Sequence, residues 1–265
     1  MKIAIGVSYN GSDFEGWQSQ TSGRTVQDEL ERALARVATH PVRLVAAGRT
    51  DSGVHALGQV AHFETGVERP VQAWVRGANS VLPSAIAVQW AQPVPDAFSA
   101  RYSATSRTYH YYVYCHPVRP AVLAGRVGWF HSPLELEPMQ AAARHLLGEH
   151  DFSAFRSIEC QAKSPVRNLR RLGIAQRGPY FIFDFTADAF LHHMVRNIVG
   201  CLLYVGKGRH PPAWLAELLA AGDRSRAAPT FPPDGLYLAE VRYGPEWNLP
   251  GFPPIMPFFS TALPE

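Results

Sequence analysis

The first hundred residues follow a regular succession of strand-like and helix-like hydrophobic patterns. Residues 3–9 alternate large apolar side chains with small ones, which is the period-two pattern of a β-strand. Thr25 then precedes apolar positions at helical spacing, with Asp28 three residues later, as expected for a helix N-cap. The same reasoning predicts strands at 42–47, 58–63 and 86–90, a loop at 48–57 and a helix at 71–80. The predicted order is β-α-β-β-α-β.

The remainder of the chain repeats this order. Its predicted elements are an aromatic strand at 107–115, a helix at 138–147, a hairpin of strands 166–176 and 180–187, a helix at 191–205, an extra helix at 211–221 and a closing strand at 236–243. Two such units make an α+β protein with two ferredoxin-like halves. We expect mostly antiparallel sheets flanking a central cleft, halves at residues 1–104 and 105–265, and an irregular tail after residue 245.

Composition and charge narrow the class of protein without identifying it. Of 265 residues, 46% are hydrophobic and 18% charged, which is ordinary for a globular protein. No apolar run approaches the ~18 residues that a membrane span needs, and the first residues lack the pattern of a signal peptide. We therefore expect a cytoplasmic protein without a membrane partner. The net charge of +3 permits an RNA partner but does not demand one.

The segment from Ala46 to Ala56 (AAGRTDSGVHA) joins glycines, charges, hydroxyls and a histidine between two predicted strands. A strand interior would not tolerate this mixture, and short loops on rigid sheets commonly present functional groups. Asp51 is the central carboxylate of this loop. It would lie in the N-terminal half of the protein, residues 1–104. The alternative is a polar turn in which Asp51 accepts backbone hydrogen bonds and does no chemistry. The residues alone leave both interpretations open.

A second candidate is the tyrosine-rich strand from Ser106 to Tyr114 (SRTYHYYVY). Strand alternation places Tyr109 and Tyr111 on one face and Tyr112 and Tyr114 on the other. Such rings commonly pack as cross-strand pairs, but they can also offer a surface on which a nucleic-acid base stacks. At most one of the two faces can belong to the core while the other is functional.

The residues that most often bind metals form no recognisable metal-site pattern. The three cysteines are scattered, without a C-x-x-C pair, which argues against a disulfide framework and a thiolate site. His192 and His193 are adjacent on the predicted helix, where neighbouring side chains diverge, and Arg196 lies on the same face. The H-E-x-x-H spacing is absent. We expect no metal ligands here.

Taken together, these segments resemble the tRNA pseudouridine synthase A (TruA) family. The resemblance covers nearly the whole chain, in the order of the family's motifs. Those motifs are Gly16-Trp17-Gln18, Gly48-Arg49-Thr50-Asp51 with Gly53-Val54-His55, Arg107 with Tyr109, Leu147-Gly148-Glu149-His150-Asp151-Phe152, His192-His193-Met194-Val195-Arg196-Asn197 and Gly235-Leu236-Tyr237. Asn10 departs from the Tyr-Asp-Gly that the family more often has, but it lies outside the loop with Asp51.

The resemblance implies a reaction that needs no cofactor. A uridine of the tRNA anticodon stem-loop, at positions 38–40, is flipped into the cleft and isomerised to pseudouridine. The glycosidic C–N bond breaks, the uracil turns while it is held in the pocket, and the base rejoins the ribose through carbon. Asp51 would attack the ribose or the base, or assist elimination to a glycal, and the sequence does not choose among these routes.

The resemblance also assigns roles to individual residues. Asp51 is the nucleophile, and Arg196 forms an ion pair with it that opposes the pKa increase caused by desolvation. Tyr109 stacks on the flipped uracil and is a candidate for proton transfer at C5. Arg49 is placed to hold the flipped nucleotide.

Basic residues of the second half are candidates for contacts with RNA phosphates, which position RNA without reading its sequence. They are Arg167 and Arg170, with Arg171 and Arg177, in the predicted hairpin, and Lys207, with Arg209, after the helix. The alternative, which is the commoner case for such residues, is an ordinary solvated surface charge. The family further implies a homodimer.

Two other functions compete with this one. Asp51-Ser52-Gly53 has the D-[ST]-G form of aspartic proteases, which share a proton between two aspartates. The chain has no second copy of that motif, and Arg49-Thr50 is polar where the motif usually follows apolar residues. A non-catalytic RNA-binding module is the second alternative, since ferredoxin-like domains often bind single-stranded RNA through aromatic side chains of the sheet. Such a module would not require Asp51.

Overall fold

The computed structural model of the chain describes residues 1–253. The chain forms two compact units, of which unit 1 contains Met1–Thr105 and the segment that begins at Tyr237, and unit 2 contains Ser106–Leu236. Each unit combines helices with strands that pair mostly antiparallel, so the predicted α+β class is confirmed. Within residues 1–253, no helix is long and apolar enough to cross a bilayer.

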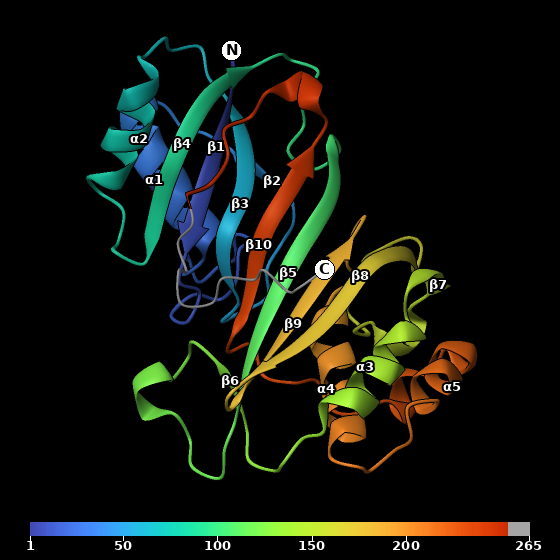
Figure 1. The fold of residues 1–265 in the computed structure, drawn as a ribbon. Coiled ribbons are helices and arrows are strands. Elements are labelled where there is room, and N and C mark those ends of the chain that lie inside the picture. Colours follow the sequence, from blue (N-terminus) through green and yellow to red (C-terminus); the bar gives the residue numbers. More distant parts are fainter. Residues whose placement is uncertain (254–265) are drawn as a thin grey trace. The chain divides into compact units, whose positions relative to one another are not determined.

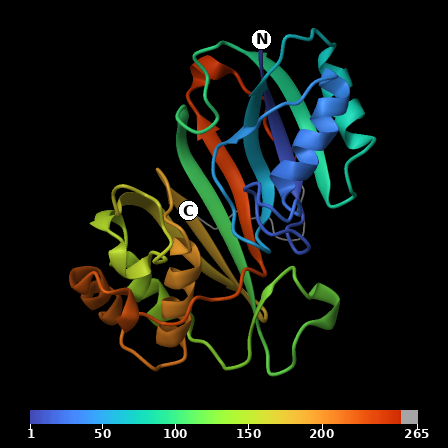
Figure 2. The same cartoon turned by 180° about the vertical axis from the view of Figure 1, so that it is seen from behind.

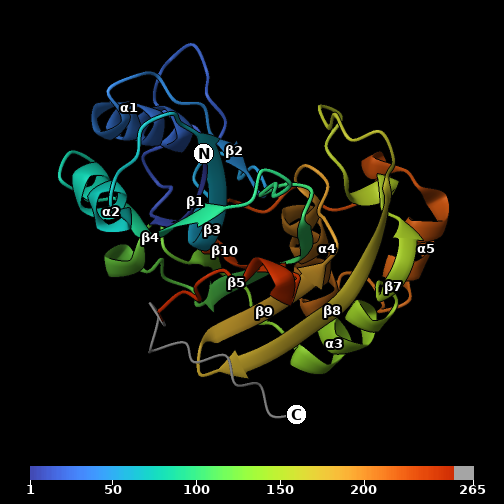
Figure 3. The ribbon, with the colours of Figure 1, turned by 90° about the horizontal axis from the view of Figure 1, so that it is seen from above.

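Unit 1 has the β-α-β-β-α-β arrangement that the hydrophobic pattern predicts. Its elements in this order are β1 (Lys2–Tyr9), α1 (Val26–Ala38), β2 (Val45–Ala46), β3 (His55–Glu64), α2 (Val71–Asn79) and β4 (Ile86–Val94). The strands are ordered β4-β1-β3-β2, and all three pairings are antiparallel. The helices α1 and α2 lie side by side on one face of this sheet (Figures 2 and 3).

The helices of unit 1 are fixed by a local cap and by packing. Thr25 caps α1 as predicted, because its hydroxyl accepts a hydrogen bond from the Asp28 amide at 3.2 Å. Five apolar residues of α1 are buried: Val26, Leu30, Ala33, Leu34 and Ala38. On α2, the Trp74 ring packs edge-on against Phe63 of β3 at 5.1 Å between ring centroids.

The last strand, β10 (Leu236–Tyr243), corrects the predicted division of the chain. We expected it to close a second half spanning residues 105–265, but Tyr237 and Leu238 pair in parallel with His55 and Ala56 of β3. The approach is close, because a Cβ atom on Gly58 would lie 2.6 Å from the carbonyl oxygen of Ala239. An alternating pattern identifies a strand and its faces, but it does not identify the strand's partner.

The sheet strands of unit 2 follow the order β5-β9-β8-β7, and β6 pairs in parallel with β5. Helix α3 packs against β8 and against α4, and α5 lies beside α3 at the edge of the unit (Figures 1 and 2). The elements are β5 (Ala104–Cys115), β6 (Gly128–Phe130), α3 (Leu136–Arg144), β7 (Gly148–Asp151), β8 (Val166–Arg177), β9 (Tyr180–Ala187), α4 (Met194–Gly206) and α5 (Trp214–Ala221).

Several boundaries in both units differ from the predicted ones, for identifiable reasons. The strand predicted at 42–47 is only Val45–Ala46, whereas β3 begins three residues earlier than expected, at His55. The strand β7 was not predicted, because its sequence Gly-Glu-His-Asp has no apolar alternation. The helix predicted from Leu191 begins at Met194, because His193 has a left-handed φ of 63° that no helical residue adopts.

Candidate active site

The Asp51 loop, residues 47–54, joins β2 to β3 as a defined turn. The Val54 amide donates to the Asp51 carbonyl oxygen at 3.1 Å, and Gly53 has a φ of +79°. That angle fits the third position of a type II turn, where glycine is favoured. The start of the loop is also fixed, since the Gln59 side chain donates to the Gly48 carbonyl oxygen at 2.7 Å. Asp51 is half-buried at the first position of this turn.

Immediately before Asp51, a buried pair of hydroxyl groups connects the loop to β1. The Thr50 hydroxyl and the Tyr9 hydroxyl lie 2.8 Å apart, and both side chains are almost completely buried. Burial raises the pKa of Tyr9 above its ordinary value, so the phenol remains a neutral hydrogen-bonding group. The Thr50 carbonyl oxygen also accepts from the Trp17 amide at 3.0 Å. Thr50, the residue before Asp51, is therefore held through both its side chain and its backbone.

The segment 10–17 packs along the other side of the loop. The Phe14 carbonyl oxygen accepts from the Ser52 hydroxyl at 3.2 Å and from the Gly53 amide at 3.3 Å. At the end of the loop, the Gly11 amide donates to Nδ1 of His55 at 3.0 Å. The His55 ring is buried and stacks on Tyr237 of β10, with 4.5 Å between ring centroids. The segments that hold the loop thus come from both ends of the chain.

Arg49 differs from its neighbours, because its side chain is exposed. In the described part of the chain it makes no ion pair. The structure therefore leaves the guanidinium of Arg49 on the surface of the loop that carries Asp51.

In unit 2, Tyr109 lies on β5 opposite Phe185 of β9. Its ring is 8% exposed and meets Phe190 edge-on, with 5.1 Å between ring centroids and 83° between the planes. The segment that carries Phe190 is fixed, because the Arg107 guanidinium donates to the Asp188 carbonyl oxygen at 2.7 Å. The orientation of the Tyr109 ring is consequently restricted before any ligand binds.

The other tyrosines of β5 show that a division into one core face and one functional face is too simple. Tyr111 and Tyr112 point to opposite faces of the strand, yet both are buried. Tyr111 donates to the Pro232 carbonyl oxygen, and Tyr114 packs against Tyr180 at 5.2 Å between centroids. Most of these rings therefore have packing partners within unit 2.

Arg196 lies in the first turn of α4 and is half-buried. Its Nε donates to the Phe231 carbonyl oxygen at 2.9 Å, and the Phe231 amide donates back to the Arg196 carbonyl oxygen at 3.3 Å. Because His192 and His193 precede the helix, our expectation that their side chains diverge is wrong. Their ring centroids lie 4.0 Å apart.

The basic residues predicted to contact phosphates are placed at two locations of unit 2. Arg167 and Arg170 lie on β8, where the Arg167 guanidinium donates to the Ser164 carbonyl oxygen at 3.0 Å. Lys207 follows the last residue of α4, and its ammonium lies 4.2 Å from the centroid of the Tyr204 ring. Arg170 and Lys207 are exposed and Arg167 is half-buried.

Three residues to which the sequence patterns assigned no individual role make buried hydrogen bonds: Tyr9, Thr50 and Asn197. Asn197 is completely buried in α4, and its amide donates to the Phe155 carbonyl oxygen at 2.7 Å. A polar residue inside the apolar stripe of a predicted helix was a signal for Asn197. No comparable local signal pairs Tyr9 with Thr50, which lie 41 residues apart.

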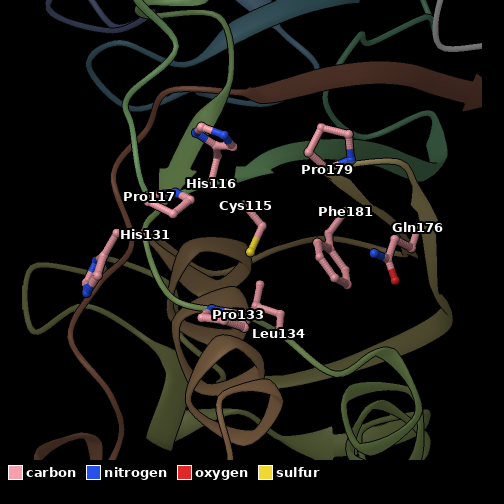
Figure 4. Close-up of a pocket in the computed structure, with 9 residues that line it drawn as sticks. All are labelled: Cys115, His116, Pro117, His131, Pro133, Leu134, Gln176, Pro179 and Phe181. Carbon is pink, nitrogen blue, oxygen red and sulfur yellow. The ribbon is translucent and has the colours of Figure 1, made fainter.

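A pocket of about 280 Å³ in unit 2 lies away from the predicted site residues. The Cys115 thiol points toward its opposite wall, formed by Pro133 and Leu134 (Figure 4). Burial raises the pKa of this thiol, which makes it a poor nucleophile. The lining residues are Cys115, His116, Pro117, His131, Pro133, Leu134, Gln176, Pro179 and Phe181, and none of them belongs to the predicted site.

Comparisons with known proteins agree on one family. The family model described as tRNA pseudouridine synthase matches residues 5–103 and 142–244. A tRNA pseudouridine synthase A of Paraburkholderia xenovorans is 59% identical over 249 residues, covering 94% of this chain and 92% of the relative. One of Polaromonas naphthalenivorans is 60% identical over 254 residues, covering 94% and 96%.

Among solved structures, a chain from the crystal structure of a Cbf5-Nop10-Gar1 complex aligns with 91% of this chain and 49% of its own length. The sequence identity is 12% and the TM-score is 0.35, which is too low to support any inference about the site.

We predict that Tyr9 and Thr50 are energetically coupled. Tyr9→Phe or Thr50→Val alone leaves a buried hydroxyl without this partner and should lower the free energy of unfolding by about 1–3 kcal/mol. The double variant should cost less than the sum of the two, with a coupling of roughly 0.5–3 kcal/mol. Urea denaturation of the four proteins measures this coupling, and strictly additive losses would show that the hydrogen bond does not hold the loop.

Proposed function

The chain belongs to the tRNA pseudouridine synthase family, and on that premise we propose that Asp51 is the essential carboxylate of its reaction. The enzyme isomerises uridine to pseudouridine in tRNA. The observation that best supports the assignment of Asp51 is its position at the start of a turn in a loop that Tyr9, Phe14 and Gln59 hold by hydrogen bonds.

A carboxylate suits this reaction for chemical reasons. The uracil leaves the ribose as an anion, so the reacting sugar needs an electron-rich partner, which an ionised Asp51 supplies. Attack at the ribose, attack at the base and assisted glycal formation all begin from this ionised form. Substrate and product contain the same atoms in the same oxidation state, so the net reaction consumes no redox or group-transfer cofactor.

Arg196 is proposed to form an ion pair with Asp51. A guanidinium beside a carboxylate lowers the carboxylate's pKa, which keeps the nucleophile ionised in a dry site. Supporting this role, the hydrogen bond from Nε to the Phe231 carbonyl oxygen fixes the plane of the guanidinium. The terminal Nη atoms then form the edge suited to a carboxylate.

Tyr109 is proposed to stack on the flipped uracil, and Arg49 to hold the flipped nucleotide. The edge-on contact with Phe190 restricts the Tyr109 ring without covering both of its faces. Arg49 is exposed two residues before Asp51, where a phosphate can reach it.

Arg167, Arg170 and Lys207 would neutralise phosphates farther along the RNA, which gives affinity and orientation without base specificity.

We place the target uridines at positions 38–40 of the anticodon stem-loop and the enzyme in the cytoplasm, where its tRNA substrate is found.

We also expect a homodimer, as the family implies. Light scattering of the pure protein should give a mass near twice the 29.3 kDa of one chain. A single-chain mass over the whole concentration range of the assay would contradict the dimer.

The central prediction concerns Asp51→Asn. This variant keeps the shape of the side chain but loses its charge, so pseudouridine formation should fall by at least about 1,000-fold, as for other nucleophiles. Binding of tRNA should remain within about threefold, since most affinity comes from phosphate contacts. The assay incubates pure protein with unmodified tRNA and maps pseudouridine at each nucleotide. Asp96→Asn, which removes an exposed carboxylate, is the matched control. An active Asp51→Asn enzyme would remove the proposed role.

The Tyr109 hydroxyl can be tested separately from its ring. Tyr109→Phe retains the stacking surface, so the KM for tRNA should change little. If the hydroxyl moves the C5 proton, kcat should fall by about 100-fold, in the range of general acid–base catalysis. Tyr109→Ala removes the ring as well and should weaken binding by about 1–3 kcal/mol. An unchanged kcat for Tyr109→Phe would restrict Tyr109 to stacking.

A further inference from the structure

Residues 228–232, here called the α4 strap, run along one side of α4 and contact it residue by residue. The Ala228 amide donates to the Cys201 sulfur at 3.4 Å, and the Thr230 hydroxyl donates to Oδ1 of Asn197 at 2.7 Å. Farther along, the Phe231 amide donates to the Arg196 carbonyl oxygen at 3.3 Å. The strap therefore follows α4 from its middle toward its N-terminus and ends beside Arg196.

Gly200 allows the strap to approach α4 this closely. A Cβ atom at this position would lie 2.4 Å from the Pro229 carbonyl oxygen, a distance that real Cβ atoms do not reach. Glycine in the middle of a helix costs about 1 kcal/mol relative to alanine. This cost is offset only if the close contact between strap and helix stabilises the protein, because the side chain of an alanine would prevent that contact.

Asn197 and Arg224 connect the strap to the rest of unit 2 through a closed hydrogen-bond network. Oδ1 of Asn197 accepts from the Thr230 hydroxyl and from Nη2 of Arg224, the latter at 3.0 Å. The same Nη2 donates to the Thr230 hydroxyl at 3.1 Å, and Nη1 donates to the Ala228 carbonyl oxygen at 2.9 Å. Because Asn197 also donates to Phe155, every polar atom of its completely buried side chain is used.

At its far end, the strap offers two carbonyl oxygens to two side chains. The Phe231 oxygen accepts from Nε of Arg196 at 2.9 Å, and the Pro232 oxygen accepts from the Tyr111 hydroxyl. The direction of the Phe231 carbonyl sets the plane of the guanidinium, since Nε–H lies in that plane. Any shift of the strap would therefore be transmitted to Arg196.

We propose that the α4 strap positions Arg196 for the reaction, and that Thr230, Asn197 and Arg224 are positioning residues that hold the strap. The inference rests on the role proposed above for Arg196. A misplacement of about 1 Å at a reacting group can cost about 100-fold in rate. Residues that contact neither RNA nor Asp51 can thus control turnover while they leave the affinity for tRNA nearly unchanged.

The test compares Thr230→Val with Thr230→Ser in the full chain. Valine keeps the shape of threonine but loses the hydroxyl, so kcat should fall about tenfold with a KM for tRNA within about twofold. Serine keeps the hydroxyl and should restore most of kcat. Circular dichroism and melting temperature verify that each variant is folded. If Thr230→Val fails to fold, Arg224→Lys perturbs the same network and takes its place.

A cycle with Arg196→Ala separates positioning from general stability. If the strap acts through Arg196, Thr230→Val should lower kcat in the wild-type background and have no further effect in the Arg196→Ala background. Equal losses in both backgrounds, or an unchanged kcat for Thr230→Val, would overturn the inference and leave the proposed function intact. An Arg196→Ala enzyme with the wild-type kcat would instead remove the role of Arg196 itself, and with it the premise of the strap.

Discussion

A short polar turn can present a half-buried carboxylate only if groups outside the turn hold its backbone. The structure meets this constraint around Asp51 with contacts from β1, β3 and the segment 10–17. The link between Thr50 and Tyr9 joins two almost completely buried side chains, and a hydrogen bond shielded from water is costly to break. The rigidity of the loop is thus a property of the sheet beneath it, since Tyr9 ends β1 and Gln59 lies within β3.

Arg196 is held by the same principle with different chemistry. Helix α4 carries Arg196, and the α4 strap lying along that helix orients the guanidinium through the Phe231 carbonyl oxygen. In both places a neighbour in the sequence makes buried hydrogen bonds: Thr50 precedes Asp51, and Asn197 follows Arg196. In each of these two pairs, the residue assigned to the reaction and the residue that supports it are adjacent in the sequence.

These features explain which parts could be predicted from the sequence. The pattern of β1, the Thr25 cap and the hairpin of β8 and β9 are local, so they were predicted nearly to the residue. The segments that contain Asp51, Tyr109 and Arg196 were identified by their unusual composition and by resemblance to a family. The partners of Thr50 and Asn197 could not be predicted, because they lie 41 residues away and 27 to 42 residues away in the chain. The pairing of β10 with β3 was not predicted for the same reason.

The placement of β10 also determines the order in which the protein can be completed during synthesis. The N-terminal sheet receives its last strand from residues that leave the ribosome after all of unit 2. Until then, the edge of β3 near His55 lacks a backbone partner, and His55 lacks the ring that stacks on it. An open strand edge is a site for wrong pairing. The half of the chain that is made first is therefore finished last, and a nascent or truncated chain carries its unfinished edge next to the segment with Asp51.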